Sequence, residues 1–169
     1  MKRLLKFAAV IVLSLVGSGL LLGQNTQKDP FVGRWRLDRA KSKYVNVQSP
    51  QHDIVITVEA QGDAQKWIFE GMAGDDSQRN LFLTYSFVID FDGSKSSPII
   101  GTGAPNGEDT VTFSRVDKNT LTSTGTKTGK VVDTSRMVVS NDEKVMTITS
   151  EGTDEQSKPV SATTVWNRQ

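Results

Sequence analysis

The sequence predicts an all-β protein, a single antiparallel up-and-down β-barrel of about eight to ten strands. Apolar and polar residues alternate with a period of two in segment after segment, and almost nowhere with the period of about 3.6 that a helix requires. Gly, Asn, Asp and Pro residues bound these segments, as turns require. Because the links between segments are short, consecutive strands are expected to run antiparallel.

Each predicted strand has one apolar face. In 53–60 the even positions up to 58 are Ile or Val, and in 80–91 every odd position is apolar or aromatic. Such strands favour a meander that closes on itself, because closure removes exposed edges, whereas a two-sheet sandwich is the alternative. Only residues 39–44 have a pattern that allows a helical turn. The ten predicted strands are 33–37, 53–60, 66–72, 80–91, 98–101, 110–116, 120–127, 130–140, 144–151 and 160–167.

The composition narrows the possible functions. The length of 169 residues fits one domain, and 20 Lys and Arg against 19 Asp and Glu argue against a nucleic-acid partner. The chain has no Cys and a single His, which excludes disulfides and thiolate metal sites and leaves few general bases. No catalytic constellation is recognisable, so we predict a protein that is not an enzyme, with no cofactor and no metal. The Thr and Ser residues of 120–128 are expected to form the solvent face of strands.

The N-terminal 23 residues have the pattern of a secretory signal peptide. Three basic residues within the first six precede the apolar run 7–16, and small residues end the segment before polar sequence begins. We expect cleavage near Gly23, with Gly19 as the alternative. An uncleaved anchor is less favoured, because the apolar segment is shorter than the roughly 20 residues that a spanning helix needs.

The predicted organisation is therefore a signal peptide (1–23), an N-terminal extension (24–30) and a barrel domain (31–169). We expect the mature protein to be extracytoplasmic (periplasmic or secreted) and bacterial, since it is exported and carries no Cys. After cleavage of the signal it is not expected to insert stably into a membrane.

The start of the barrel domain resembles a known group of barrels. Gly33 and Trp35 form the Gly-x-Trp signature of the calycin superfamily of lipocalin-like proteins, and 31–37 is especially similar to the opening of fatty-acid-binding proteins. The whole mature chain also resembles uncharacterised exported lipocalin-like bacterial proteins, through 33–43, Lys158-Pro159-Val160 and the final Arg168-Gln169. The resemblance implies that Trp35 plugs one barrel end, that Gly33 permits close backbone approach, and that Arg168 packs across the Trp ring.

One feature of the fatty-acid-binding proteins is missing. They hold the ligand carboxylate with an Arg-x-Tyr pair on the last strand, and Thr164 and Trp166 occupy the matching positions here. A ligand anion could instead meet Arg115, which shares a face with Phe113, or Arg136, whose facing the pattern leaves open. The alternative for either Arg is that it points to solvent after a bulge shifts the register.

The predicted function is that of an exported, non-catalytic protein that binds a small hydrophobic or amphipathic molecule inside the barrel. The alternative is a structural or interaction module of the cell envelope whose barrel is filled by the same side chains. A cavity of about 300 Å³ or more would favour binding. No pattern specifies an oligomeric state. The predicted lining is Trp67, Phe69, Tyr85, Phe87, Phe113 and Trp166, with Arg115 and Arg136 as candidate polar contacts.

Overall fold

The computed structural model describes residues 28–73, 80–154 and 156–169, and these contain eleven β-strands and no helix. The predicted signal peptide (1–23) lies outside the described residues, as does most of the predicted extension. The strands are β1 (Gly33–Val45), β2 (Asp53–Gln61), β3 (Ala64–Ala73), β4 (Asn80–Ile89), β5 (Asp92–Pro98), β6 (Ile100–Thr102), β7 (Thr110–Asp117), β8 (Thr120–Lys127), β9 (Lys130–Val139), β10 (Val145–Thr153) and β11 (Pro159–Arg168).

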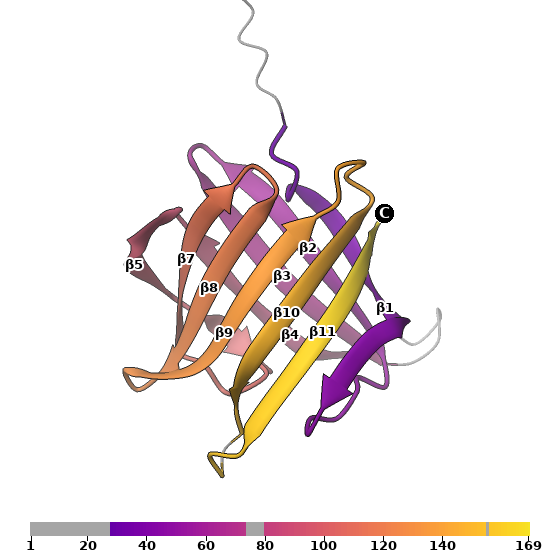
Figure 1. Cartoon of the computed structure of the whole chain (residues 1–169), viewed down its shortest axis with the longest axis vertical. Helices are drawn as coiled ribbons and strands as arrows, with labels where there is room; N and C mark the ends of the chain where they lie inside the picture. The colour runs from indigo at the N-terminus through magenta and orange to yellow at the C-terminus, as the bar shows by residue number, and fades with distance from the viewer. Residues whose placement is uncertain (1–27, 74–79, 155) are drawn as a thin grey trace, which may run out of the picture.

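All of these strands belong to one antiparallel sheet that curves into a nearly closed barrel (Figure 1). The order is β5-β7-β8-β9-β10-β11-β1-β2-β3-β4-β6, so most strands pair with their neighbours in the sequence. The last strand returns to the first, with Arg168 opposite Trp35 and Trp166 opposite Leu37. The predicted all-β, antiparallel barrel is confirmed.

The sheet is interrupted between β4 and β7. The short strand β6 pairs with residues 84–86 of β4, whereas β5 pairs with β7. The chain therefore leaves β4, runs along β7 and returns to β4, and the single strand predicted over 98–101 is in fact two. Gly101 makes the return possible, because its φ is +122° and a Cβ there would lie 2.1 Å from the Thr84 carbonyl oxygen.

The helical turn that the pattern allows over 39–44 does not form, because these residues belong to β1. The register of β1 against β11 shifts between Asp38 and Lys43, so the strand bulges there. The Ser42 hydroxyl donates to the Asp38 carbonyl oxygen (2.7 Å) and accepts from the backbone N–H of Val165 (3.0 Å). The side chain thus replaces a ladder hydrogen bond that the bulge disrupts, and pairing with β11 continues beyond it.

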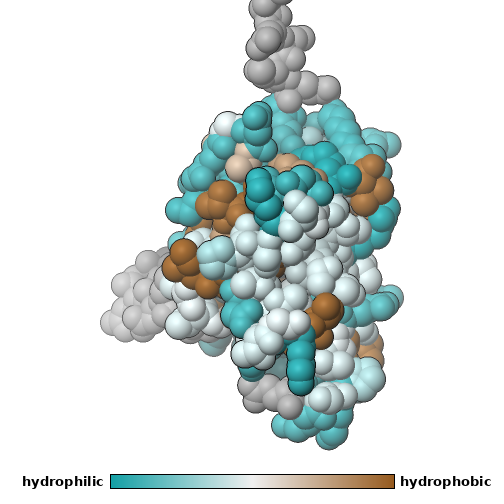
Figure 2. Space-filling model, turned by 90° about the vertical axis from the view of Figure 1, so that its left-hand side faces the viewer, coloured by the Kyte–Doolittle hydropathy of each residue, from teal (hydrophilic) through white to brown (hydrophobic). Residues whose placement is uncertain are grey.

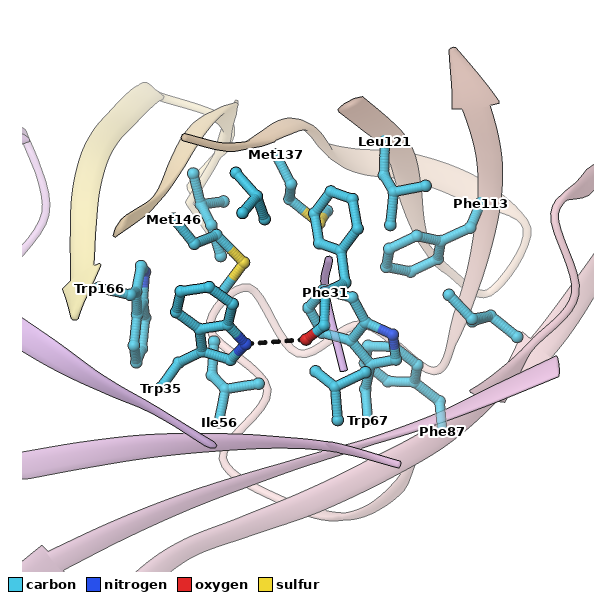
Figure 3. Close-up of a cluster of buried hydrophobic side chains, with 14 of the residues drawn as sticks. Phe31, Trp35, Ile56, Trp67, Phe87, Phe113, Leu121, Met137, Met146 and Trp166 are labelled. Carbon is cyan, nitrogen blue, oxygen red and sulfur yellow. Dashed lines mark hydrogen bonds between the residues drawn. The ribbon is translucent and has the colours of Figure 1, made fainter. Parts of the chain in front are cut away.

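The core is built from residues that alternate along the strands and point into the barrel. Trp67 is fully buried, and its ring centroid lies 5.7 Å from that of Phe113 and 6.4 Å from that of Phe87. Trp35, also fully buried, donates its indole N–H to the Phe31 carbonyl oxygen at 2.8 Å (Figure 3). Each large apolar side chain contributes about 1.5–3 kcal/mol when it is fully buried. The cluster also contains Leu37, Ile56, Val58, Tyr85, Ile89, Val111, Leu121, Met137, Val139, Met146, Ile148 and Trp166.

The outer face of the barrel is mainly polar. Figure 2 shows the side that carries β5 and β7, where apolar side chains stand apart from one another among hydrophilic and neutral ones. Exposed apolar residues such as Val88 and Ile100 are exceptions on an otherwise hydrated sheet surface. None of the described residues forms a helix with the length and apolarity needed to cross a bilayer.

Candidate ligand-binding site

Side chains close the end of the barrel that lies next to the N-terminal segment. The guanidinium carbon of Arg168 sits 4.1 Å from the ring centroid of Trp35, and its N–H groups donate to the carbonyl oxygens of Val32 (2.8 Å) and Pro30. A Cβ on Gly33 would lie 2.4 Å from Arg168 Nη1, and the φ of +147° at this position is one that side chains rarely adopt. The three residues that the resemblance singles out therefore meet at the closed end.

Arg115 also lies at this closed end. Its guanidinium forms an ion pair with Asp29, at 2.5 Å between Nη2 and Oδ2, and its carbon lies 4.2 Å from the ring centroid of Phe91. Asp29 in turn accepts a hydrogen bond from the backbone N–H of Phe31 at 2.9 Å. Arg115 thus ties the N-terminal segment to the barrel, and the structure does not bring it to the ligand position considered from the sequence.

A cavity of about 270 Å³ occupies the other half of the barrel. Residues of the links 46–52 and 103–109 lie at its opening, on the side away from the N-terminal segment. The volume is close to the value of about 300 Å³ at which small-molecule sites begin. The barrel therefore has a solidly packed half and a hollow half.

One wall of the cavity is aromatic, and it contains all six residues of the predicted apolar lining. Phe69 stacks on Tyr85 with ring centroids 4.5 Å apart, and Phe87 lies 5.5 Å from Phe113. Trp166 donates its indole N–H to the Thr164 hydroxyl at 2.8 Å, so this wall also presents little free polar surface. The structure gathers the six side chains in one place, and their contact with a ligand stays a prediction.

A second part of the lining, formed by β8, β9 and β10, carries polar side chains beside Met137 and Ile148. Ser123, Ser135 and Ser150 lie side by side on these neighbouring strands and line the cavity. The hydroxyl oxygens of Ser135 and Ser150 are 2.7 Å apart, and Ser135 donates to Asp133 Oδ2 at 2.9 Å. The expectation that the Ser and Thr residues of 120–128 form only a solvent face is wrong at Ser123, which is 8% exposed.

Asp133 sits in this wall under conditions that disfavour its charge. Burial raises the pKa of Asp133 from 3.8 to about 6, the hydrogen bond from Ser135 opposes that rise, and the nearby charge of Glu108 adds to it. Glu108 comes from the link before β7 and accepts hydrogen bonds from the backbone and side-chain N–H groups of Asn106 at 3.1 and 3.2 Å. Burial also raises the pKa of the Tyr85 hydroxyl, and the charges of Glu108 and Asp133 raise it further.

Basic side chains do not reach the cavity in the part of the chain that the structure describes. Arg136 is exposed and lies on the outer face of β9, because Met137 and Val139 of the same strand take the inward positions. The structure thus places neither candidate Arg against the cavity. The acidic residues were missed from the sequence, because the apolar residues of β9 fall on both parities and Glu108 lies in a link.

The fold is similar to that of solved β-barrel proteins, among them fatty-acid-binding proteins. A Schistosoma mansoni fatty acid binding protein in complex with arachidonic acid is similar with a TM-score of 0.57 at 16% identity, over 83% of this chain and 96% of that one. The REP1-NXSQ fatty acid transporter has a TM-score of 0.53 at 13% identity, over 82% and 95% of the two chains. The S-type phycobiliprotein lyase CPES from Guillardia theta has a TM-score of 0.50 at 10% identity, over 83% and 89%.

No protein-family model matches the sequence, and no curated protein matches it. At the identities found for the solved structures, the likeness shows a common fold alone, because one fold serves many functions.

Proposed function

We propose that this protein binds a small hydrophobic or amphipathic molecule in the cavity of the barrel. The observation that carries the proposal is the cavity of about 270 Å³ with its aromatic wall. Protein interiors are normally packed as densely as organic crystals, and an apolar void of this size costs stability. The other half of the same barrel is filled by side chains such as Trp35, Leu121 and Met146, so the hollow half is a local feature that a ligand would fill.

The fold supports the proposal by analogy. Two of the similar structures are named for fatty acids, which are apolar molecules with one polar end. The present cavity combines an aromatic wall with a row of hydroxyl and carboxyl groups, and small-molecule sites commonly join apolar walls to a few placed polar groups.

We further propose that the protein is exported, that it acts outside the cytoplasm and that its role is not catalytic. Export is supported by the basic and apolar pattern of residues 1–23. Cell fractionation followed by N-terminal sequencing tests this proposal. A cytoplasmic protein that retains residues 1–23 would refute it.

Binding is tested first by native mass spectrometry of the protein from the cells that naturally produce it, with solvent extraction of whatever is released. The purified protein is then titrated with the neutral fluorescent probe N-phenyl-1-naphthylamine. The variant Ala162→Trp places an indole inside the cavity, and Thr149→Trp adds the same side chain on the exposed face of β10 as its control.

A bound molecule, or probe uptake that Ala162→Trp abolishes and Thr149→Trp preserves, would support binding in the cavity. A clean apo mass together with no probe uptake by the unmodified protein would refute it and favour the alternative, a structural module without a ligand.

A further inference from the structure

The charged side chains that line the cavity are acidic. Asp133 and Glu108 reach the wall, and no Lys, Arg or His among the described residues does so. Ser135 holds Asp133 by a hydrogen bond of 2.9 Å, and Asn106 holds Glu108 by two of 3.1 and 3.2 Å. Both carboxyl groups are therefore oriented in the absence of a ligand, which lowers the entropy cost of binding one.

A third polar group points into the same region. Tyr85 is 7% exposed and lines the same cavity as Glu108 and Asp133, whose charges add to the rise in the pKa of its hydroxyl that burial causes. None of the hydrogen bonds formed among the described residues uses this hydroxyl, and it is not one of the fully buried atoms that lack a partner. A ligand group in the cavity could therefore form a hydrogen bond with it.

We propose that the ligand carries a protonated amine, which donates hydrogen bonds to Asp133 and Glu108 while its apolar part packs against the aromatic wall. This inference rests on the proposed function and specifies the class of ligand. An ammonium group donates hydrogen bonds, which the two carboxylates can accept, and its positive charge is opposite to theirs.

A carboxylate ligand does not fit this wall. It would add a third negative charge to a poorly hydrated site, where like charges repel strongly. The last strand brings no cation to the cavity either, since Thr164 and Trp166 line it there and Arg168 packs on Trp35 at the closed end. A metal ion is not favoured, because the described residues contain no group of three or more side chains placed to hold one.

The ionisation of Asp133 predicts how amine binding depends on pH. Its pKa is raised to about 6 by burial, so the carboxyl is mostly charged at pH 7.5 and mostly neutral at pH 5. The groups that face Asp133 are Glu108 from the link before β7 and Tyr85 from β4, and neither supplies a positive charge. Lys127, at the end of β8, lies near the opening, with its Nζ 2.9 Å from where a Cβ on Gly107 would be.

The test compares three ligands with the same chain and different heads: dodecan-1-amine, dodecan-1-ol and dodecanoate. Each is titrated into the purified protein by calorimetry at pH 7.5 and pH 5, below its micelle-forming concentration. We expect the amine to bind about tenfold more tightly than dodecanoate at pH 7.5, and to lose affinity at pH 5 although it remains protonated.

Three variants test whether Asp133 and Glu108 are the groups that bind the amine. Asp133→Asn should weaken amine binding about tenfold and leave the alcohol nearly unchanged, because only the charge is removed. Glu108→Gln should act in the same direction and provides a second test if one variant folds poorly. Glu151→Gln removes the same charge from the exposed outer face of β10 and should change neither affinity.

The outcomes are distinguishable. Dodecanoate or dodecan-1-ol binding as tightly as the amine would overturn the amine assignment and leave the binding function intact. An equal effect of Asp133→Asn and Glu151→Gln on the amine would overturn it as well, because a general surface charge would then be responsible. Failure of all three ligands to bind while the neutral probe is still taken up would overturn this inference alone, and failure of the probe as well, with a clean apo mass, would overturn the proposed function.

Discussion

Replacing Asp133 with Asn should make the ligand-free protein more stable at neutral pH, because the change removes a charge that folding buries. The pKa of this carboxyl is 3.8 in its ordinary environment and about 6 in the barrel, mainly through burial. A folded-state pKa above the unfolded value means that the folded state binds the proton more tightly. The free energy of unfolding therefore falls as pH rises from about 4 to about 6. Above pH 6 the contribution of Asp133 changes no further, because its carboxyl is then charged in both the folded and the unfolded state.

The magnitude follows from that difference in pKa. About two pH units at about 1.4 kcal/mol each give about 3 kcal/mol as the upper limit of the gain at pH 7.5. The Asn variant also loses the charge-assisted hydrogen bond from Ser135, which favours the ionised carboxyl, and this loss reduces the gain in stability. At pH 4 the folded protein already carries a neutral Asp133, so the variant and the unmodified protein should differ little there.

Urea unfolding followed by tryptophan fluorescence at several pH values between 4 and 7.5 measures the difference directly. Other carboxyl groups also titrate in this range, and comparing the two proteins at each pH cancels their contributions. The gain should grow with pH and level off above pH 6. A variant that is less stable at pH 7.5, or a difference that does not change with pH, would refute the reasoning that the barrel disfavours the charge of Asp133.

Three further predictions concern the rest of the barrel. Gly33→Ala should lower stability by about 1–3 kcal/mol in urea unfolding, because of the φ of +147° and the crowding by Arg168, and an unchanged midpoint would contradict this. Arg168→Lys keeps the charge but loses the stacking on Trp35 and the two hydrogen bonds of the guanidinium to backbone carbonyl oxygens. Thermal unfolding should therefore show a loss of about 1–3 kcal/mol in stability. Equal stability of the two proteins would show that the charge alone suffices. The pKa of Asp142 is lowered, first by the hydrogen bond from the Ser140 hydroxyl, so its contribution to stability is present above its ordinary pKa and is lost as pH falls. Asp142→Ala should therefore destabilise the protein at pH 7 and much less at pH 2.5, and an equal loss at both would be inconsistent with that cause.

The sequence predicts the fold well where a strand is apolar on only one face. In 80–91 the odd positions are apolar, and Tyr85, Phe87 and Ile89 are all buried. The same alternation predicted which aromatic residues line the cavity, since the inward-facing side chains of paired strands in a barrel share one interior. A period-two pattern therefore carries information about the site as well as about the strands.

The polar wall was harder to predict, because the local pattern there is ambiguous. In β9, Val131, Val132 and Val138 place apolar residues on both parities, and only pairing with β8 and β10 fixes Asp133 as an inward residue. The partner of Arg115 could not be predicted, for a different reason. It is on the inner face, but its partner is Asp29, 86 residues away in the sequence, and no local pattern reports such a contact.

The pairing of β1 with β11 has a consequence for how the protein folds. Because the first strand closes on the last, no closed barrel can form until the final strand is available, and the pair that joins Trp35 to Arg168 spans nearly the whole domain. Topologies dominated by such long-range pairing fold slowly, on a scale of about milliseconds to seconds. The barrel can therefore close only after β11 has been synthesised, and until then the edge of β1 that faces β11 stays unpaired.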